Sequence, residues 1–325
     1  MRRLGTVQQK ISCVFRTEVQ DKPSGKREAQ PFHVAATENL NLSALESDIH
    51  SAVATEKLDG TCCYISKYKG KQFLWARLDR KPNKQADKRW KKFQSSQKTS
   101  TGFMWNLKED FKDVPDNWIP AHSVPHIDGC PVPDDHGHIL GWVPVEWNSK
   151  QYCWHSSVVD YEIELALVLQ PDREDEDMLE ITCVPLSELQ DQTLELIGTN
   201  INGNPYGLGS KKQPLHFLVP HGAIHVRDAL PVNYTQLHTW LSEADRGKVE
   251  GIVWHCNNGA LFKLHRHHVN LKWPCGKPFL NTRPVVIRFD GHREQLDGSC
   301  QGMFSAFSKL HGQTFQSLED ILFDD

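Results

Sequence analysis

Residues 55–64 read Thr55-Glu56-Lys57-Leu58-Asp59-Gly60-Thr61-Cys62-Cys63-Tyr64. This pattern predicts a short strand, a turn that Gly60 permits, and a second strand, with Lys57 held just before the turn. A lysine amine attacks only when unprotonated, and its ordinary pKa of about 10.4 leaves it mostly charged at neutral pH. A reactive Lys57 therefore needs burial or neighbouring cations. The alternative is a hairpin turn with a solvent-exposed lysine.

The composition is that of an ordinary globular protein, with 38% hydrophobic and 24% charged residues. The chain has 37 basic and 41 acidic residues, so its formal net charge is −4. A nucleic-acid partner would therefore have to bind a local basic patch. The nine cysteines include no C-x-x-C pair, which argues against a zinc ribbon or a disulfide framework. With no membrane-length apolar run and no signal-peptide pattern, we expect an intracellular protein, cytoplasmic or nuclear, that is neither secreted nor in a membrane.

The order of the predicted elements indicates an α+β fold with mostly antiparallel sheets and flanking helices. Residues 113–150 are rich in Pro, Gly and Asp and are expected to form a long irregular insertion. The predicted helices are 42–52 (with Asn41 or Ser43 as cap), 83–93 and 303–310. The predicted strands are 13–19, 73–78, 158–169 and 179–185 (a hairpin), 194–197, 217–219, 224–227, 251–255 and 260–264.

Four downstream segments carry residues suited to phosphate chemistry. Arg77 follows an alternating strand and offers a planar fork to phosphate or ribose oxygens. Glu195 and Glu250 stand among apolar residues, where a carboxylate needs a hydroxyl, a cation or a metal as partner. Lys263 and His265 fall on one face of a predicted strand.

These five segments, in this order, resemble the motifs of the covalent nucleotidyltransferases, which include ATP-dependent ligases and mRNA-capping guanylyltransferases. The resemblance covers residues 56 to about 266, and the block Glu195-Leu196-Ile197-Gly198 with Asn202-Gly203-Asn204-Pro205-Tyr206 is most similar to the RNA-ligase branch. It implies the nucleotidyltransferase (adenylyltransferase) fold of ATP-dependent ligases over 1–272, with the insertion at about 113–150. Residues 273–325 would form a small C-terminal extension without a full OB domain.

The resemblance also implies an activity. ATP-dependent RNA ligases join RNA 5′-phosphate and 3′-hydroxyl ends through a lysyl-AMP and an adenylylated RNA, with Mg²⁺ or, in its place, Mn²⁺. Lys57 would be the nucleophile, and Lys263 would hold the α-phosphate and support departure of pyrophosphate. Glu250 would serve the metal, with Glu195 as a possible second ligand. The expected ATP-binding residues are Glu56, Asp59, Gly60, Arg77, Glu195, Lys263 and, as the stacking aromatic, Phe217.

Two positions depart from the family pattern. Cys62 stands where many RNA ligases have an asparagine, and His265 or Arg266 must serve in place of a second lysine. The alternatives are a capping guanylyltransferase, a DNA ligase, or a non-catalytic protein that binds RNA ends. We expect a monomer.

Residues 77–98 contain nine basic residues and only two acidic ones. If 83–93 is helical, three lysines line one face while Trp90 and Phe93 lie on another. The stripe would track RNA phosphates, or it would be an ordinary solvated face, with the two aromatics in the core. The expected RNA-binding residues are Arg80, Lys81, Lys84, Lys88, Lys92, His265 and Arg266. The three histidines 265, 267 and 268 favour phosphate contact or packing over a metal site.

Overall fold

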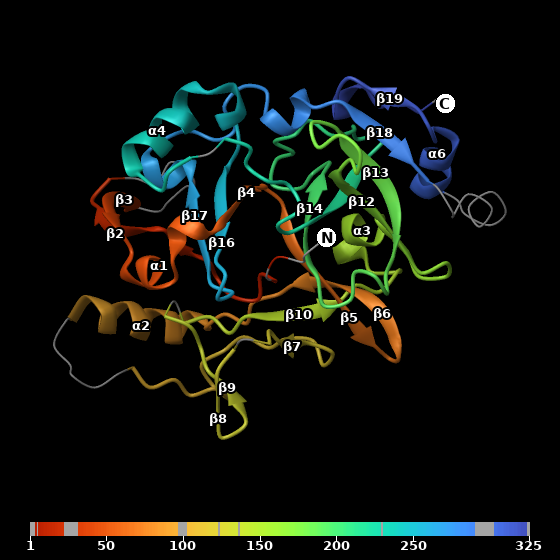
Figure 1. Ribbon diagram of the computed structural model, residues 1–325. Helices are drawn as coiled ribbons and strands as arrows, with labels where there is room; N and C mark the ends of the chain where they lie inside the picture. The colour runs from red at the N-terminus through yellow and green to blue at the C-terminus, as the bar shows by residue number, and fades with distance from the viewer. Residues whose placement is uncertain are drawn as a thin grey trace.

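The computed structural model describes residues 4, 6–22, 32–96, 103–122, 124–135, 137–228, 230–289 and 302–323. It is an α+β structure in which most strand pairs are antiparallel, and two sheets form its centre (Figure 1). Parallel pairing is confined, among the described strands, to β1–β17, β12–β15 and β13–β18. The expected α+β class with mostly antiparallel sheets is therefore confirmed.

The smaller central sheet has four strands. Its order is β1 (Ser12–Cys13), β17 (Leu261–His265), β16 (Gly251–His255) and β4 (Val53–Lys57). One face packs on α1 (Leu42–Glu46) and α4 (Tyr234–Glu243), with Leu237, Trp254 and Leu264 in the shared core. Asn41 caps α1 by accepting from the Ser43 N–H at 3.2 Å, as expected. A hairpin of β2 (Phe15–Gln20) and β3 (His33–Leu40) adjoins this sheet.

The larger sheet has eleven strands, and Tyr64, Leu167 and Phe217 are among its fully buried residues. Its order is β19 (Thr314–Phe315), β18 (Val285–Arg288), β13 (Leu179–Pro185), β12 (Leu165–Pro171), β15 (His216–Pro220), β14 (Thr193–Gly198), β5 (Thr61–Tyr68), β6 (Lys71–Arg77), β10 (Gly141–Pro144) and β7 (Ile119–Pro120), with β11 (Val159–Asp160) beside β12. The predicted hairpin of β12 and β13 is confirmed.

The chain passes from the small sheet to the large one through the short turn between β4 and β5. Gly60 is required in this turn, because a Cβ there would lie 2.3 Å from the Leu196 carbonyl oxygen and 2.8 Å from Glu195 Cγ. The turn therefore places the end of β4 directly against β14 of the large sheet.

Several expectations were wrong in detail. Residues 158–169 are not a single strand, because 161–164 form a turn between β11 and β12. Residues 224–227 form no strand, but Val226 N–H donates to the Ala54 carbonyl, so the segment lies along the edge of β4. The stretch 113–150 is not wholly irregular, because β10 is buried and pairs with β6, and β8 (His126–Ile127) pairs with β9 (Cys130–Pro131). Alternation is too short in four-residue strands for the sequence pattern to reveal them.

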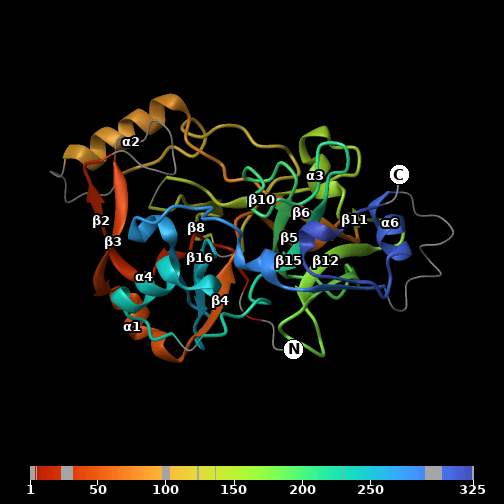
Figure 2. The same cartoon turned by 90° about the horizontal axis from the view of Figure 1, so that it is seen from above.

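The remaining elements lie at the periphery. Figures 1 and 2 place α2 (Lys84–Ser96) at the end of the molecule that carries the small sheet, and α6 (Met303–Lys309) at the opposite end. Beyond residue 272, β18 and β19 extend the large sheet by pairing with β13 and with each other. The short helix α3 (Cys153–Ser156) precedes β11. The described residues contain no helix that is both long and apolar enough to span a membrane.

Candidate active site

Lys57 is the last residue of β4 and forms an ion pair with Glu250, which immediately precedes β16. Its Nζ donates to Glu250 Oε2 at 2.5 Å, and the two side chains are 24% and 3% exposed. Burial works to lower the pKa of Lys57, but the carboxylates of Glu250, Glu195 and Asp59 outweigh it and raise the pKa above its ordinary value. In the protein alone, these carboxylates therefore keep Lys57 as an ammonium ion.

Antiparallel pairing places the predicted phosphate-binding cations on the same face as Lys57. Lys57 lies opposite Gly251, and Gly251 lies opposite His265. Lys263 lies two residues before His265 on β17, opposite Val253, and therefore on the same face. A Cβ at Gly251 would stand 2.1 Å from the Leu264 carbonyl oxygen, so only glycine lets the strands approach here.

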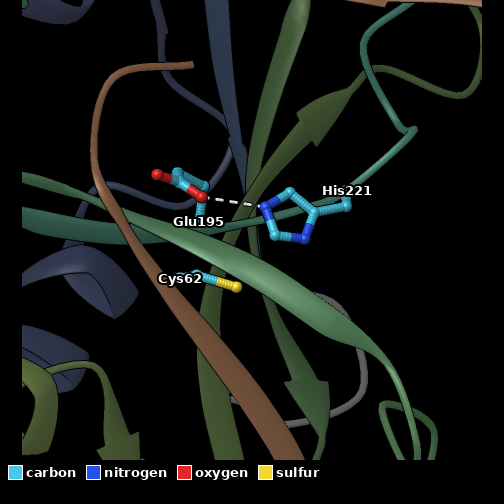
Figure 3. Close-up of side chains that lie close together, drawn as sticks. All are labelled: Cys62, Glu195 and His221. Carbon is cyan, nitrogen blue, oxygen red and sulfur yellow. Dashed lines mark hydrogen bonds and ion pairs between the residues drawn. The ribbon is translucent and has the colours of Figure 1, made fainter. Parts of the chain in front are cut away.

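Glu195, on β14 of the large sheet, lies across from Lys57. Its Oε1 accepts from the Gly60 N–H at 3.1 Å, and its Oε2 lies 2.8 Å from His221 Nε2. Cys62 is the register partner of Glu195 on β5, so both side chains stand on the same face of the large sheet (Figure 3). His221 was not predicted from the sequence; the Pro220-His221-Gly222 turn just after β15 is the one signal that could have drawn attention to it.

A cavity of about 220 Å³ lies between these two walls. Glu56, Lys57, Glu195 and Lys263, all predicted from the sequence, line it together. It is also lined by Val7, Gln9, Lys10, Ile11, Thr55, Leu58, Cys62, Val219, Pro220, His221, Gly222, Ile224, Val253 and His255. Residues as far apart in the chain as Val7 and Lys263 thus converge on one space.

Two further acidic residues flank Lys57. Burial raises the pKa of Glu56 to about 7, although Arg283 and Arg227 act to lower it. Asp59 is held by neighbours that sequence reasoning missed: its Oδ2 accepts from Trp273 Nε1 at 2.8 Å, and its Oδ1 accepts from Asn202 Nδ2 at 2.9 Å. The conformation of the turn after Lys57 is therefore supported by Asn202 and by Trp273.

Arg77 lies beside the cavity and is not among its lining residues. Its Nε donates to Asp79 Oδ1 at 2.6 Å, its Nη1 donates to the Gln8 carbonyl at 3.2 Å, and its guanidinium lies 4.8 Å from the centre of the Trp142 ring. These contacts fix the guanidinium next to the wall that carries Cys62.

Two predicted site residues occupy structural positions instead. Phe217 is fully buried, and its ring centroid lies 5.6 Å from that of Phe307 on α6, so neither face is open for stacking on a base. Arg266 is 4% exposed and donates to three carbonyl oxygens, those of Leu241, Gly247 and Lys272 at 2.6–2.9 Å. Its side chain therefore links three backbone segments by hydrogen bonds and is not available to RNA.

A second, larger cavity of about 710 Å³ begins at Glu250 and Asp59. His265 lies on its wall, and its ring stacks on that of His268 with centroids 3.6 Å apart. The cavity is lined by Lys22, His33, Asp59, Asn202, Glu250, His265, Arg266, His267, Asn270, Leu271, Lys272, Trp273 and Pro274. Basic side chains therefore predominate, and the acids are confined to the end next to Lys57.

The basic helix forms as predicted. Three of its four lysines, Lys84, Lys88 and Lys92, are exposed on one side of α2. Trp90 packs against Phe103 and Trp105, with ring centroids 5.1 and 5.6 Å away. Arg80 is engaged by the Lys112 carbonyl at 2.9 Å, whereas Lys81 is exposed.

Comparison with known proteins agrees with this geometry. The family model described as RNA ligase 1 matches residues 1–324. Proteins named RNA ligase 1 from Danio rerio and Rattus norvegicus are 59% and 57% identical over 324 residues, and one from Mus musculus is 57% identical over 326, in each case over all of both chains. The protein is thus an enzyme of the ligase class. The chain belongs to the RNA ligase 1 family.

Proposed function

We propose that this protein is an ATP-dependent RNA ligase that joins 5′-phosphate to 3′-hydroxyl ends, built on the adenylyltransferase fold. The observation that carries the proposal is the convergence of Lys57, Glu195 and Lys263 on one cavity at the junction of the two sheets. In the first step, Lys57 Nζ attacks the α-phosphate of ATP and pyrophosphate leaves. AMP then passes to an RNA 5′-phosphate, and a 3′-hydroxyl displaces it to close the phosphodiester.

The first step requires Lys57 to lose a proton. At rest its ammonium is stabilised by Glu250 at 2.5 Å, with Glu195 and Asp59 acting in the same direction. Positive charge brought in beside Glu250 weakens this stabilisation and lowers the pKa of the amine. Lys57 is therefore protonated and unreactive at rest, and it becomes a nucleophile only when the bound substrates and metal lower its pKa.

The same carboxylates suit Mg²⁺, a hard cation that prefers oxygen ligands. Glu250 is the principal residue that would hold it, with Glu195 and Asp59 near enough to act on the same lysine. When bound, Mg²⁺ supplies charge that stabilises phosphate oxygens in the transition state. Lys263 and His265 add protein cations on the same face of the small sheet.

The nucleotide and the RNA are assigned to different cavities. The smaller cavity holds the nucleoside, with Glu56 beside the base and Glu195 at the ribose. Arg77 does not line this cavity. The larger cavity, with Lys22, His265 and Lys272 on its wall, suits an RNA strand because its phosphates need a line of cations. The exposed lysines of α2 offer a further line of cations to RNA, outside both cavities.

A sealing assay tests the function. The protein is incubated with ATP, Mg²⁺ and RNA carrying a 5′-phosphate and a 3′-hydroxyl, and the joined product is resolved by gel. We expect joining of this RNA and none with 5′-hydroxyl RNA or with Lys57→Arg. Covalent labelling by GTP in place of ATP would favour a capping enzyme, joining of DNA alone a DNA ligase, and RNA binding without labelling a non-catalytic end-binding protein.

A further inference from the structure

Cys62, Glu195 and His221 bring a sulfur, an oxygen and a nitrogen together on the wall of the smaller cavity (Figure 3). The Cys62 Sγ, a Glu195 carboxylate oxygen and an imidazole nitrogen of His221 all lie within 4.8 Å of one another. Among the described residues, this is the one group of three or more His, Cys, Asp or Glu side chains with such spacing. We propose that these three residues form a site for a divalent transition metal, of which Zn²⁺ is the best fit, and that metal bound there blocks the nucleotide.

The backbone holds the three ligands in place before any ion arrives. Cys62 and Glu195 are direct partners across β5 and β14. His221 is tied to β14 because its backbone N–H donates to the Thr193 carbonyl at 3.1 Å. Tetrahedral zinc places its S, N and O ligands at about 2.0–2.3 Å from the metal, so side-chain rotations alone bring the three atoms onto one ion.

The surrounding hydrogen bonds suit this role. His221 Nδ1 lies 2.8 Å from Thr193 Oγ1, and the Gly60 N–H donates to Glu195 Oε1. In the metal-free protein, the Nε2 proton of His221 faces the Glu195 carboxylate. On coordination this proton moves to Nδ1, where Thr193 accepts it, and the ring presents Nε2 to the metal. Such outer contacts orient metal-binding histidines in many proteins.

The ligand set also selects the kind of metal. Thiolate and imidazole favour zinc and cobalt over Mg²⁺, which prefers oxygen alone. Burial and Glu195 raise the pKa of the Cys62 thiol, so coordination must displace its proton into solvent. The cavity supplies the open fourth position for a water molecule.

Competition with the nucleotide follows from the position of Glu195, and this part rests on the proposed function. If Glu195 binds the ribose, it cannot at the same time ligate a metal on the cavity wall. Zinc and ATP then exclude each other, and zinc inhibits lysyl-AMP formation.

Cobalt absorption tests the site without relying on activity. Metal-free full-length protein is titrated with Co²⁺ in the absence of oxygen, and the thiolate-to-cobalt charge-transfer band is followed in the near ultraviolet. The variants are Cys62→Ser, His221→Gln and, as the matched control, Cys153→Ser, because Cys153 is exposed and outside the cavity. Far-ultraviolet circular dichroism checks that each variant is folded.

We expect the wild type and Cys153→Ser to give the band at one cobalt per chain, and Zn²⁺ to displace it. Cys62→Ser should lose the band, and His221→Gln should bind Co²⁺ at least about tenfold more weakly. Zinc should also inhibit ATP labelling less strongly in Cys62→Ser: the zinc concentration for half inhibition, measured against each protein's own zinc-free rate, should rise at least about tenfold. A wild type without the band, a band retained in Cys62→Ser, or equal zinc inhibition in Cys62→Ser and Cys153→Ser would overturn the proposal. Failure of ATP labelling itself would instead count against the ligase assignment.

Discussion

Replacing Glu56 with glutamine should stabilise the protein, and increasingly so as the pH rises. Burial raises the pKa of this carboxyl from 4.5 to about 7. The folded protein therefore binds the proton more tightly than the unfolded chain does. The stability that this proton contributes is complete below pH 4.5 and is lost as the pH rises through about 7.

The magnitude follows from the pKa difference. At about 1.4 kcal/mol for each pH unit, the change from 4.5 to about 7 corresponds to roughly 3 kcal/mol as an upper limit. Glutamine keeps the shape of the side chain and carries no charge to desolvate. The advantage of Glu56→Gln over the wild type should thus grow by up to roughly 3 kcal/mol between about pH 4.5 and pH 8.

Urea unfolding at a series of pH values measures this difference. Other titrating groups cancel because both proteins share them, and Glu46→Gln on the exposed side of α1 serves as the matched control. The control should show no such growth. A stability difference between Glu56→Gln and the wild type that stays constant over this pH range would refute the reasoning.

Three other variants give sharp expectations. Arg266→Ala should lower the free energy of unfolding by roughly 3 kcal/mol, since two buried carbonyls and one part-buried carbonyl lose their donor, and leave RNA affinity unchanged in binding assays at low temperature. Changing Lys84, Lys88 and Lys92 of α2 to glutamine should lower the slope of log RNA affinity against log salt by about 2 without altering ATP labelling, and an unchanged slope would remove α2 from the RNA path. Gly60→Ala should lower the rate of ATP labelling by about a hundredfold, because the new methyl displaces Glu195. A rate close to wild type would show that the backbone of the turn moves and Glu195 stays in place.

The local architecture of the site was largely predictable, because its strands have strong alternating patterns. The predicted strand 251–255 is β16 as observed, and 194–197 and 217–219 fall within β14 and β15. Motif order also identified the cavity-lining residues Lys57, Glu195 and Lys263. Local sequence carries this information because strand periodicity determines which side chains share a face.

Tertiary contacts account for what the sequence did not reveal. The burial of Phe217 depends on α6, which lies about ninety positions away in the chain. The raised pKa of Lys57 depends mainly on Glu250, just before β16, and on Glu195 of β14, and both are far from Lys57 in the chain. His221 joins the site because β15 ends beside Glu195, a pairing that only the assembled sheet defines.

The proposed mechanism requires a covalent bond between AMP and the amine of Lys57. The full-length protein is incubated with ATP and Mg²⁺, digested, and mapped by mass spectrometry for a peptide that carries one added AMP. We expect the added mass on Lys57, its loss on treatment with acid, and no modified peptide in Lys57→Arg. AMP attached to another residue, or a Lys57→Arg variant labelled as fully as the wild type, would contradict the central claim.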